Sequence, residues 1–93
     1  MTEDRTKTIE TMRKQYLDEY RYISKKDDRV AFFEEMSEMA AAAGVSTWKK
    51  FADGMSAWLR EDTEAALALL EKAIELDIEF AYPWNGKGNV LYS

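Results

Sequence analysis

Two pairs of residues, each 34 positions apart, constrain the fold of this chain more than any other feature. Gly54 and Gly88 form one pair, and Trp58 and Tyr92 form the other. Between them, residues 64–77 (EAALALLEKAIELD) are almost all strong helix formers. Their apolar residues recur every three or four positions, which is the period of one helix face. A 34-residue period built on such helices is typical of repeated helical hairpins, so we expect an all-α fold.

The same region resembles the tetratricopeptide repeat (TPR) family. In that family the second helix of a hairpin has a small-x3-large-x2-small pattern, matched here by Ala66, Leu70 and Ala73. The first helix has a Trp-x2-Leu-Gly-x2-Tyr pattern, matched here by Trp84-x2-Lys87-Gly88-x2-Leu91. The chain departs from the family at three places: Lys50 stands where the first repeat has Trp, Lys87 in the Leu position, and Ile78 where the closing Pro is usual.

The resemblance implies a TPR-like right-handed α-solenoid of antiparallel helical hairpins, with about five helices. It covers one full repeat, at about 47–80, and the opening helix of the next repeat, at about 81–93. We therefore divide the chain into an N-terminal helical hairpin at 1–45, which is a degenerate repeat or a cap, and the TPR-like part at 46–93.

Local signals predict the ends of the individual helices. Periodicity indicates helices at 3–23 and 29–43, which form the N-terminal hairpin, and further helices at 46–60, 63–77 and from about 81 onwards. Pro83 fits the first turn of the last helix, and packing should hold its glycine-rich centre at 85–89 helical. A small residue at Gly54 or Ala73 lets paired helices approach closely, and Gly88 should do the same in the next hairpin. The expected start and stop residues are Asp27 or Asp28, Gly44, Ser46 or Thr47, and Asp62 or Thr63.

Composition excludes several classes of chemistry. The 93 residues make at most one domain and include neither Cys nor His. This removes disulfides, zinc thiolate sites and the usual nucleophile–histidine pairs. Glu34, Glu35 and Glu38 lack a further ligand or a calcium-type loop, so we interpret them as a solvated helix face. We predict no catalytic residue, no cofactor and no metal, and we expect the protein not to be an enzyme.

The distribution of charged and apolar residues indicates which partners and which cellular location to expect. The net charge is −5; residues 1–29 carry eight basic and seven acidic side chains, whereas residues 30–93 carry five and eleven. An acidic body disfavours nucleic acid and anionic membranes as partners. Acids also interrupt the one basic-aromatic set that suggests RNA: Arg13, Tyr16, Arg21, Tyr22, Lys25 and Lys26. Because the sequence shows no signal-peptide core and no run of membrane-spanning length, we expect a cytoplasmic protein.

The resemblance also implies a partner-binding groove. In TPR proteins the first helices of successive hairpins line a concave groove that binds peptides or helices. The corresponding positions here are Trp48, Phe51, Met55, Trp58, Leu59, Tyr82, Asn85, Asn89, Tyr92 and Ser93. Trp58 and Tyr92 are the leading contact candidates, because aromatic residues dominate interface energetics. Asn85 and Asn89 are placed to hydrogen-bond a peptide backbone. Phe51 and Met55 occupy places where capture of an acidic C-terminus needs Lys or Arg, so that ligand is not predicted.

The helix at 46–60 is apolar on two sides, and a patch of this kind is too apolar to stay bare on a monomer. It is covered by the N-terminal hairpin, by a second copy or by a partner. In the first case its aromatic residues pack on Met12, Tyr16, Tyr20, Phe33 and Met36. We expect a non-catalytic module that binds a peptide or helix through the aromatic groove. The alternative is a homodimerisation module that uses the same face and the unpaired last helix, because the pattern stops midway through a repeat.

Overall fold

The computed structural model describes residues 2–77 and 80–92, and these residues form five α-helices and one short 3₁₀ turn, with no strand among them. The all-α prediction is therefore confirmed, including the number of helices. The predicted link at Ile78 and the groove position at Ser93 lie outside the described residues. The elements are α1 (Thr2–Asp18), the 3₁₀ turn (Tyr20–Tyr22), α2 (Lys26–Ala43), α3 (Ser46–Leu59), α4 (Thr63–Leu76) and α5 (Ala81–Tyr92).

Two of the predicted helix ends are confirmed. Gly44 ends α2 in the left-handed region, with φ 72°, and its amide donates to the carbonyls of Ala40 and Ala41. Glycine adopts this conformation without the steric cost that a Cβ brings. Asp62 precedes α4, and its carboxylate accepts a hydrogen bond from the Ala65 amide at 3.2 Å.

The other two predicted starts are wrong. Lys25 precedes α2 without a side-chain cap, and Asp27 and Asp28 lie inside the first turn, where their charge still favours the positive end of the helix. Val45 precedes α3, also without a side-chain cap. Val45 is buried, so this position serves core packing, and the hydroxyl residues that follow it fall inside the helix.

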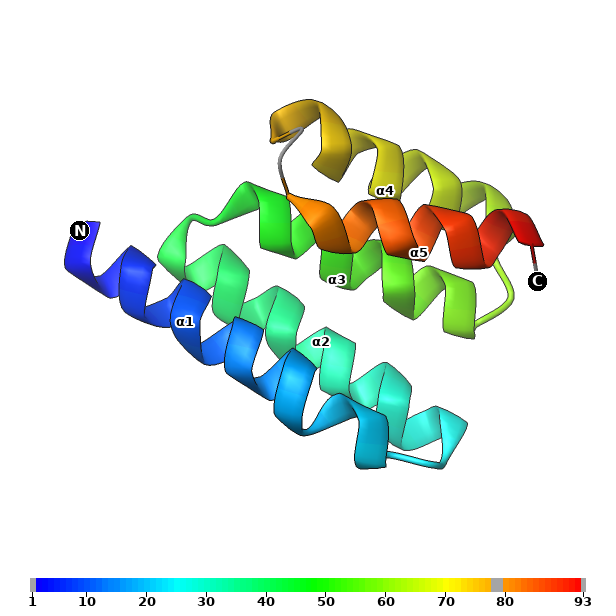
Figure 1. Cartoon of the computed structure of the whole chain (residues 1–93), viewed down its shortest axis with the longest axis horizontal. Helices are drawn as coiled ribbons and strands as arrows, with labels where there is room; N and C mark the ends of the chain where they lie inside the picture. Colours follow the sequence, from blue (N-terminus) through cyan, green and yellow to red (C-terminus); the bar gives the residue numbers. More distant parts are fainter. Residues whose placement is uncertain (1, 78–79, 93) are drawn as a thin grey trace.

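The helices pack as successive antiparallel neighbours (Figure 1). α1 lies against α2, α3 against α4, and α5 runs back along α4 in the opposite direction. α2 also packs on α3, so the N-terminal hairpin and the C-terminal three helices share one hydrophobic core. The fully buried side chains of that core include Met12 from α1, Phe33 from α2, Phe51 from α3 and Leu70 from α4.

Leu70 sits between two glycines on two different helices. A Cβ built on Gly54 of α3 would lie 2.9 Å from Leu70 Cγ, and one built on Gly86 of α5 would lie 3.2 Å from Leu70 Cδ2. The prediction of close approach at Gly54 is confirmed. The prediction for Gly88 concerned a following hairpin, whose second helix is not among the described residues, so it stays a prediction; a Cβ on Gly88 would meet nothing within 4 Å. The close contact of α5 with α4 is made by Gly86.

Candidate interaction surface

Three of the predicted groove residues on α3 lie inside the molecule. Trp48, Phe51 and Met55 are each at most 3% exposed. The Tyr16 ring of α1 lies edge-on to Phe51 with centroids 5.3 Å apart, and it also meets the Tyr82 ring of α5 at 5.1 Å. Phe51, on the face of α3 where the resemblance placed the groove, thus packs against Tyr16 of α1 and Phe33 of α2. Trp48 meets Phe80 and Tyr82 at the entry to α5, and the Met55 sulfur lies close to Gly86 of α5.

The covered face is a continuous cluster of aromatic rings. Neighbouring centroids lie 4.8 to 6.1 Å apart, within the range in which tilted and edge-to-face pairs are favourable. The cluster comprises Tyr16, Tyr20, Phe32, Phe33, Trp48, Phe51, Phe80 and Tyr82. Residues from α1, the 3₁₀ turn, α2, α3 and the chain at the entry to α5 thus meet in one place, and we call this set the closed aromatic cluster.

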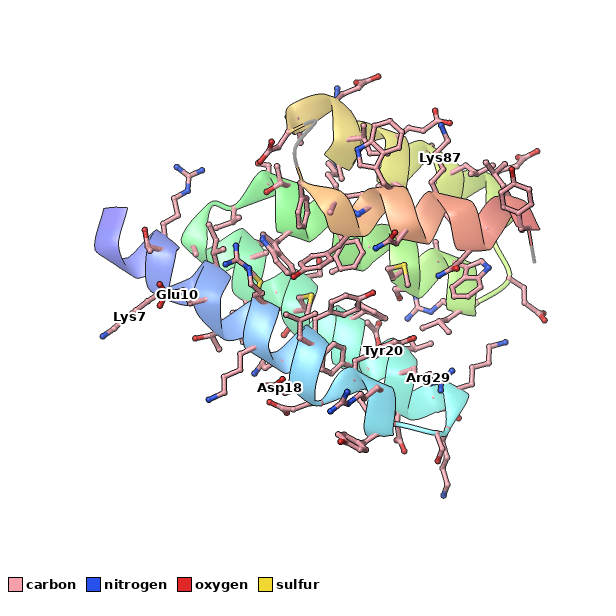
Figure 2. All side chains as sticks on the ribbon, in the orientation of Figure 1. Lys7, Glu10, Asp18, Tyr20, Arg29 and Lys87 are labelled. Carbon is pink, nitrogen blue, oxygen red and sulfur yellow. The ribbon has the colours of Figure 1, made fainter. Side chains whose placement is uncertain are left out.

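Two tyrosines of the closed aromatic cluster have perturbed acidity. Burial raises the pKa of the Tyr16 hydroxyl above its ordinary value of 10.0, and the neighbouring Tyr20 and Tyr82 phenols add to the effect. Burial also raises the pKa of Tyr20, while Arg29 acts in the opposite direction. The Arg29 guanidinium lies 5.6 Å from the Tyr20 ring centroid and donates to the Ile23 carbonyl (Figure 2). Both hydroxyls therefore favour the neutral form.

The remaining predicted contact residues are divided between two places. Trp58 and Leu59 are partly buried near the end of α3, where they line a shallow cavity with Lys26, Glu61 and Thr63. Asn85, Asn89 and Tyr92 are exposed on α5. Tyr82 belongs to the closed aromatic cluster instead. The structure thus does not bring the predicted set together as a single open groove.

The exposed side of α5 contains two large side chains that were not predicted as contact residues. Trp84 is 47% exposed and Leu91 is 56% exposed, and Tyr92 beside them is 91% exposed. Together with Gly88 they form what we call the open α5 face. The signal was present in the sequence, since Trp84, Gly88 and Leu91 follow one another at steps of four and three, the spacing of one helix face.

The open α5 face carries no formal charge. Lys87 is the one charged residue of α5, and its ammonium lies 3.5 Å from the Glu71 carboxylate on α4 (Figure 2). This pair lies on the α4 side of the helix. In a chain whose residues are one-third charged, an uncharged exposed helix face with three large apolar side chains is a candidate contact surface.

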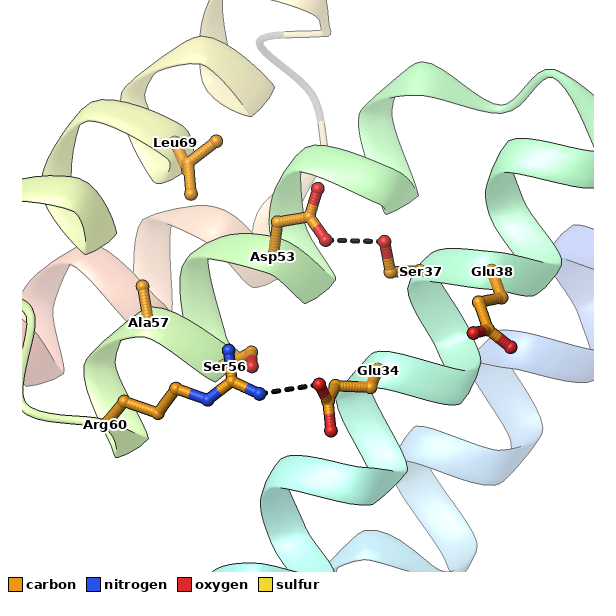
Figure 3. Close-up of a pocket in the computed structure, with 8 residues that line it drawn as sticks. All are labelled: Glu34, Ser37, Glu38, Asp53, Ser56, Ala57, Arg60 and Leu69. Carbon is orange, nitrogen blue, oxygen red and sulfur yellow. Dashed lines mark hydrogen bonds and ion pairs between the residues drawn. The ribbon is translucent and has the colours of Figure 1, made fainter.

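A polar cavity of about 470 Å³ lies between α2, α3 and α4 (Figure 3). Arg60 pairs with Glu34, and Ser37 donates a hydrogen bond to Asp53, so both interactions join α2 to α3. Lys49 also donates to Asp53, at 2.7 Å. The Ser56 hydroxyl is buried with no hydrogen-bond partner among the described residues. The Glu34 and Asp53 carboxylates already accept these hydrogen bonds, so neither is left as a free base for the Ser56 hydroxyl.

Within residues 2–77 and 80–92, no three acidic side chains are grouped closely enough to hold a metal ion. None of the helices formed by these residues combines the length and the apolar character needed to cross a bilayer. The predicted acidic residues Glu34, Glu35 and Glu38 are exposed on α2, and Glu34 is engaged by Arg60.

No family model, curated protein or solved structure matches this chain. The resemblance to the TPR family therefore depends on the sequence patterns and the 34-residue spacing alone.

Proposed function

We propose that this chain is a non-catalytic, TPR-like interaction module that binds a helix of a protein partner on the open α5 face. The observation that carries the proposal is the pair of equivalent glycines. Gly54 and Gly88 are 34 residues apart; the first is covered by Leu70 of α4, and the second has open space above it. Gly88 is thus a helix-docking position without a helix on it.

The packing of α4 on α3 supplies a template for the bound state. Leu70 enters the space above Gly54 and is fully buried, with the small residues Ala66 and Ala73 on the same buried face of α4. A small residue on one helix and a large one on the other allow ridges to fit into grooves. A partner helix with a small-x3-large-x2-small pattern would fit Gly88 in the same way, between Trp84 and Leu91.

This proposal moves the contact surface from the groove that the resemblance implied. Trp48, Phe51 and Met55 are buried in the shared core, so they are not part of the contact surface. Asn85, Asn89 and Tyr92 remain in the proposed surface. Both asparagines are exposed and flank the docking position, where their amides would hydrogen-bond polar groups of the incoming helix.

The stacking of the hairpins would be that of a right-handed α-solenoid, in which the docked helix packs on α5 as α4 packs on α3. The partner is a protein or a peptide, and neither nucleic acid nor a membrane is expected on an acidic body. We expect the module to act in the cytoplasm, as a scaffold without cofactor or catalytic residue. Self-association is the second candidate function, because the large exposed side chains of the open α5 face would also be covered by a second copy.

A peptide with the sequence of residues 62–77 provides a direct test, because it contains the helix that already packs on Gly54. The peptide should be acetylated and amidated, since short isolated helices are marginal in water. Added to the isotope-labelled chain, it should shift the NMR signals of the Gly88 amide and the Trp84 indole. The signal of the Trp48 indole, which is buried, should not shift.

Two controls make this test specific. A peptide with Leu70→Glu keeps the helix-forming sequence but loses the side chain that fills the space above glycine, and it should not bind. The chain variant Gly88→Glu places a charge where a Cβ meets no neighbour, so it should fold normally and lose binding. Equal shifts with both peptides, or shifts that avoid α5, would contradict the proposal.

A further inference from the structure

A further cavity, of about 430 Å³, lies where four segments of the chain meet. Its walls come from α1, the first turn of α3, the end of α4 and the chain at the entry to α5. Figure 1 shows α3 and α5 beginning beside each other, next to the end of α4. No residue of the open α5 face lines this cavity. A molecule bound here would therefore leave that face free for a partner helix.

Three aromatic residues line part of the cavity. Trp48, Phe80 and Tyr82 belong to the closed aromatic cluster, and the centroids of each pair of these rings lie 4.9 to 5.6 Å apart. Phe80 and Tyr82 are only partly buried, so ring surface remains accessible from the cavity. A planar apolar group placed there can pack on these rings in the tilted and edge-on geometries that the cluster already uses.

Two side chains of opposite charge line the same cavity. Arg13 comes from α1, and Asp77 is the residue that follows α4. Both are exposed, and among the described residues no ion pair joins the two. The cavity thus offers one positive and one negative group, and each attracts a ligand group of the opposite sign.

The helix ends beside the cavity have the same polarity as these two charges. α3 begins there, and no side chain caps it. The Lys49 amide is the first to bond back, to the Val45 carbonyl at 3.1 Å, so the amides of the three residues before it lack a helical partner. The beginning of α3 therefore adds positive potential, and the end of α4, next to Asp77, adds negative potential.

Trp48 has a hydrogen-bond donor that the chain itself does not use. The residue is 3% exposed, and its indole N–H donates to no other described residue. Most buried polar groups in proteins have a hydrogen-bond partner. Because Trp48 lines the cavity, an acceptor atom of a bound molecule can supply the partner that is missing.

We infer that this cavity binds a free α-amino acid with an aromatic side chain. The carboxylate of the ligand accepts hydrogen bonds from the Arg13 guanidinium and the Trp48 indole N–H. The ammonium faces the Asp77 carboxylate, and the ring packs on Phe80 and Tyr82. A zwitterion fits because it presents one charge of each sign, whereas a simple anion or cation would place a like charge beside Asp77 or Arg13. This site goes beyond the proposed function and does not depend on it.

The first test titrates L-phenylalanine into the isotope-labelled chain. The Trp48 indole signal should shift saturably, with a dissociation constant of about 1 mM or lower. The signals of the Trp58 indole and the Gly88 amide should stay in place, which separates this site from the helix-docking surface. L-alanine carries the same two charges without a ring, so it should cause no shift. If L-phenylalanine gave no saturable shift of the Trp48 signal at about ten times that concentration, the inference would be overturned.

The second test compares ligands that each lack one charge. Phenylpropionate has no ammonium and phenylethylamine has no carboxylate, and each should bind about three- to tenfold more weakly than L-phenylalanine. N-acetyl-L-phenylalanine and L-phenylalaninamide stand for the last and the first residue of a peptide, and they should be weakened equally. If any of these four compounds bound as tightly as L-phenylalanine, the site would not be one for a free amino acid.

The third test assigns each ligand charge to its partner. Arg13→Gln should weaken L-phenylalanine about three- to tenfold and leave phenylethylamine unchanged, because only the carboxylate loses a partner. Asp77→Asn should weaken L-phenylalanine by a similar factor and leave phenylpropionate unchanged. Lys14→Gln is the matched control, since Lys14 is exposed on α1, carries the same charge as Arg13 and does not line the cavity.

All three substituted positions are exposed, so circular dichroism should show the same helicity in each variant. Binding of L-phenylalanine that was unaffected by Arg13→Gln and Asp77→Asn, or weakened equally by Lys14→Gln, would contradict the assigned contacts.

Discussion

The closed aromatic cluster and the open α5 face both contain large aromatic side chains, but the first is buried and the second is exposed. On α3, Phe51 is buried against Tyr16 of α1, and Trp48 is buried against Phe80 and Tyr82. On α5, Trp84 and Tyr92 are exposed. The difference lies in the neighbours: α3 has helices on several sides, whereas α5 packs mainly on α4 and more lightly on α3. Large apolar side chains thus indicate contact, and the number of surrounding helices determines whether that contact is internal.

Truncation of one ring in each of the two regions should give the largest difference in stability between them. Phe51→Ala removes a fully buried ring in contact with Tyr16, Phe33 and Trp48. It should lower the free energy of unfolding by about 3–5 kcal/mol, as expected for lost burial plus a residual cavity. Tyr92→Ala should change it by less than about 0.5 kcal/mol in dilute solution. Urea unfolding followed by circular dichroism measures both, and similar losses would mean that the two faces do not differ.

Gly54 and Gly88, the two glycines 34 residues apart, provide a second comparison. Substitution by alanine should lower the free energy of unfolding at Gly54 and raise it at Gly88. Gly54→Ala puts a methyl 2.9 Å from Leu70 Cγ, and overpacking of about 1–3 kcal/mol should exceed the helix-propensity gain of about 1 kcal/mol. Gly88→Ala should stabilise the monomer by about 0.5–1 kcal/mol. Thermal and urea unfolding at low concentration would check both. A gain in stability from Gly54→Ala would show that Leu70 shifts easily.

High pH should destabilise the closed aromatic cluster. The pKa values of Tyr16 and Tyr20 are raised in the folded chain, so the unfolded chain loses these protons first. Stability is therefore complete below about pH 10, where the unfolded phenols titrate, and falls as pH rises towards the folded pKa values. Tyr16→Phe should reduce this alkaline loss, whereas Tyr22→Phe, on an exposed ring, should leave it unchanged. Unfolding curves at pH 8 and about pH 10.5 test this, and identical slopes for both variants would refute it.

The ion pair between Glu34 of α2 and Arg60 at the end of α3 should contribute least to the free energy of unfolding. Glu34 and Arg60 are each more than half exposed, and exposed ion pairs contribute about 0–1 kcal/mol. Glu34→Gln should thus cost at most about 0.5 kcal/mol, and added salt should reduce the difference. Urea unfolding with and without sodium chloride measures this. A loss above about 2 kcal/mol would show that the polar contacts between α2 and α3, rather than the closed aromatic cluster, hold the N-terminal hairpin against α3.

The sequence predicted most of the local structure correctly. Helical periodicity located all five helices, and the residue preferences at Gly44 and Asp62 identified two of their ends. Helix periodicity and helix ends depend on residues within about one turn of each other, and such residues are also close together in the sequence. The starts of α2 and α3 were mispredicted because several adjacent residues suit a helix N-terminus, and Val45 is placed by its burial rather than by its capping ability.

The sequence alone determined that this chain forms amphipathic helices with too much apolar surface for any one of them to stand alone. It did not determine which apolar face would be covered. Tyr16 of α1 packs on Phe51 of α3, 35 residues away, and Gly86 meets Leu70 because of where α5 crosses α4. Both outcomes depend on how rigid helices fit together in three dimensions, since the period of a helix specifies a face but not its neighbour.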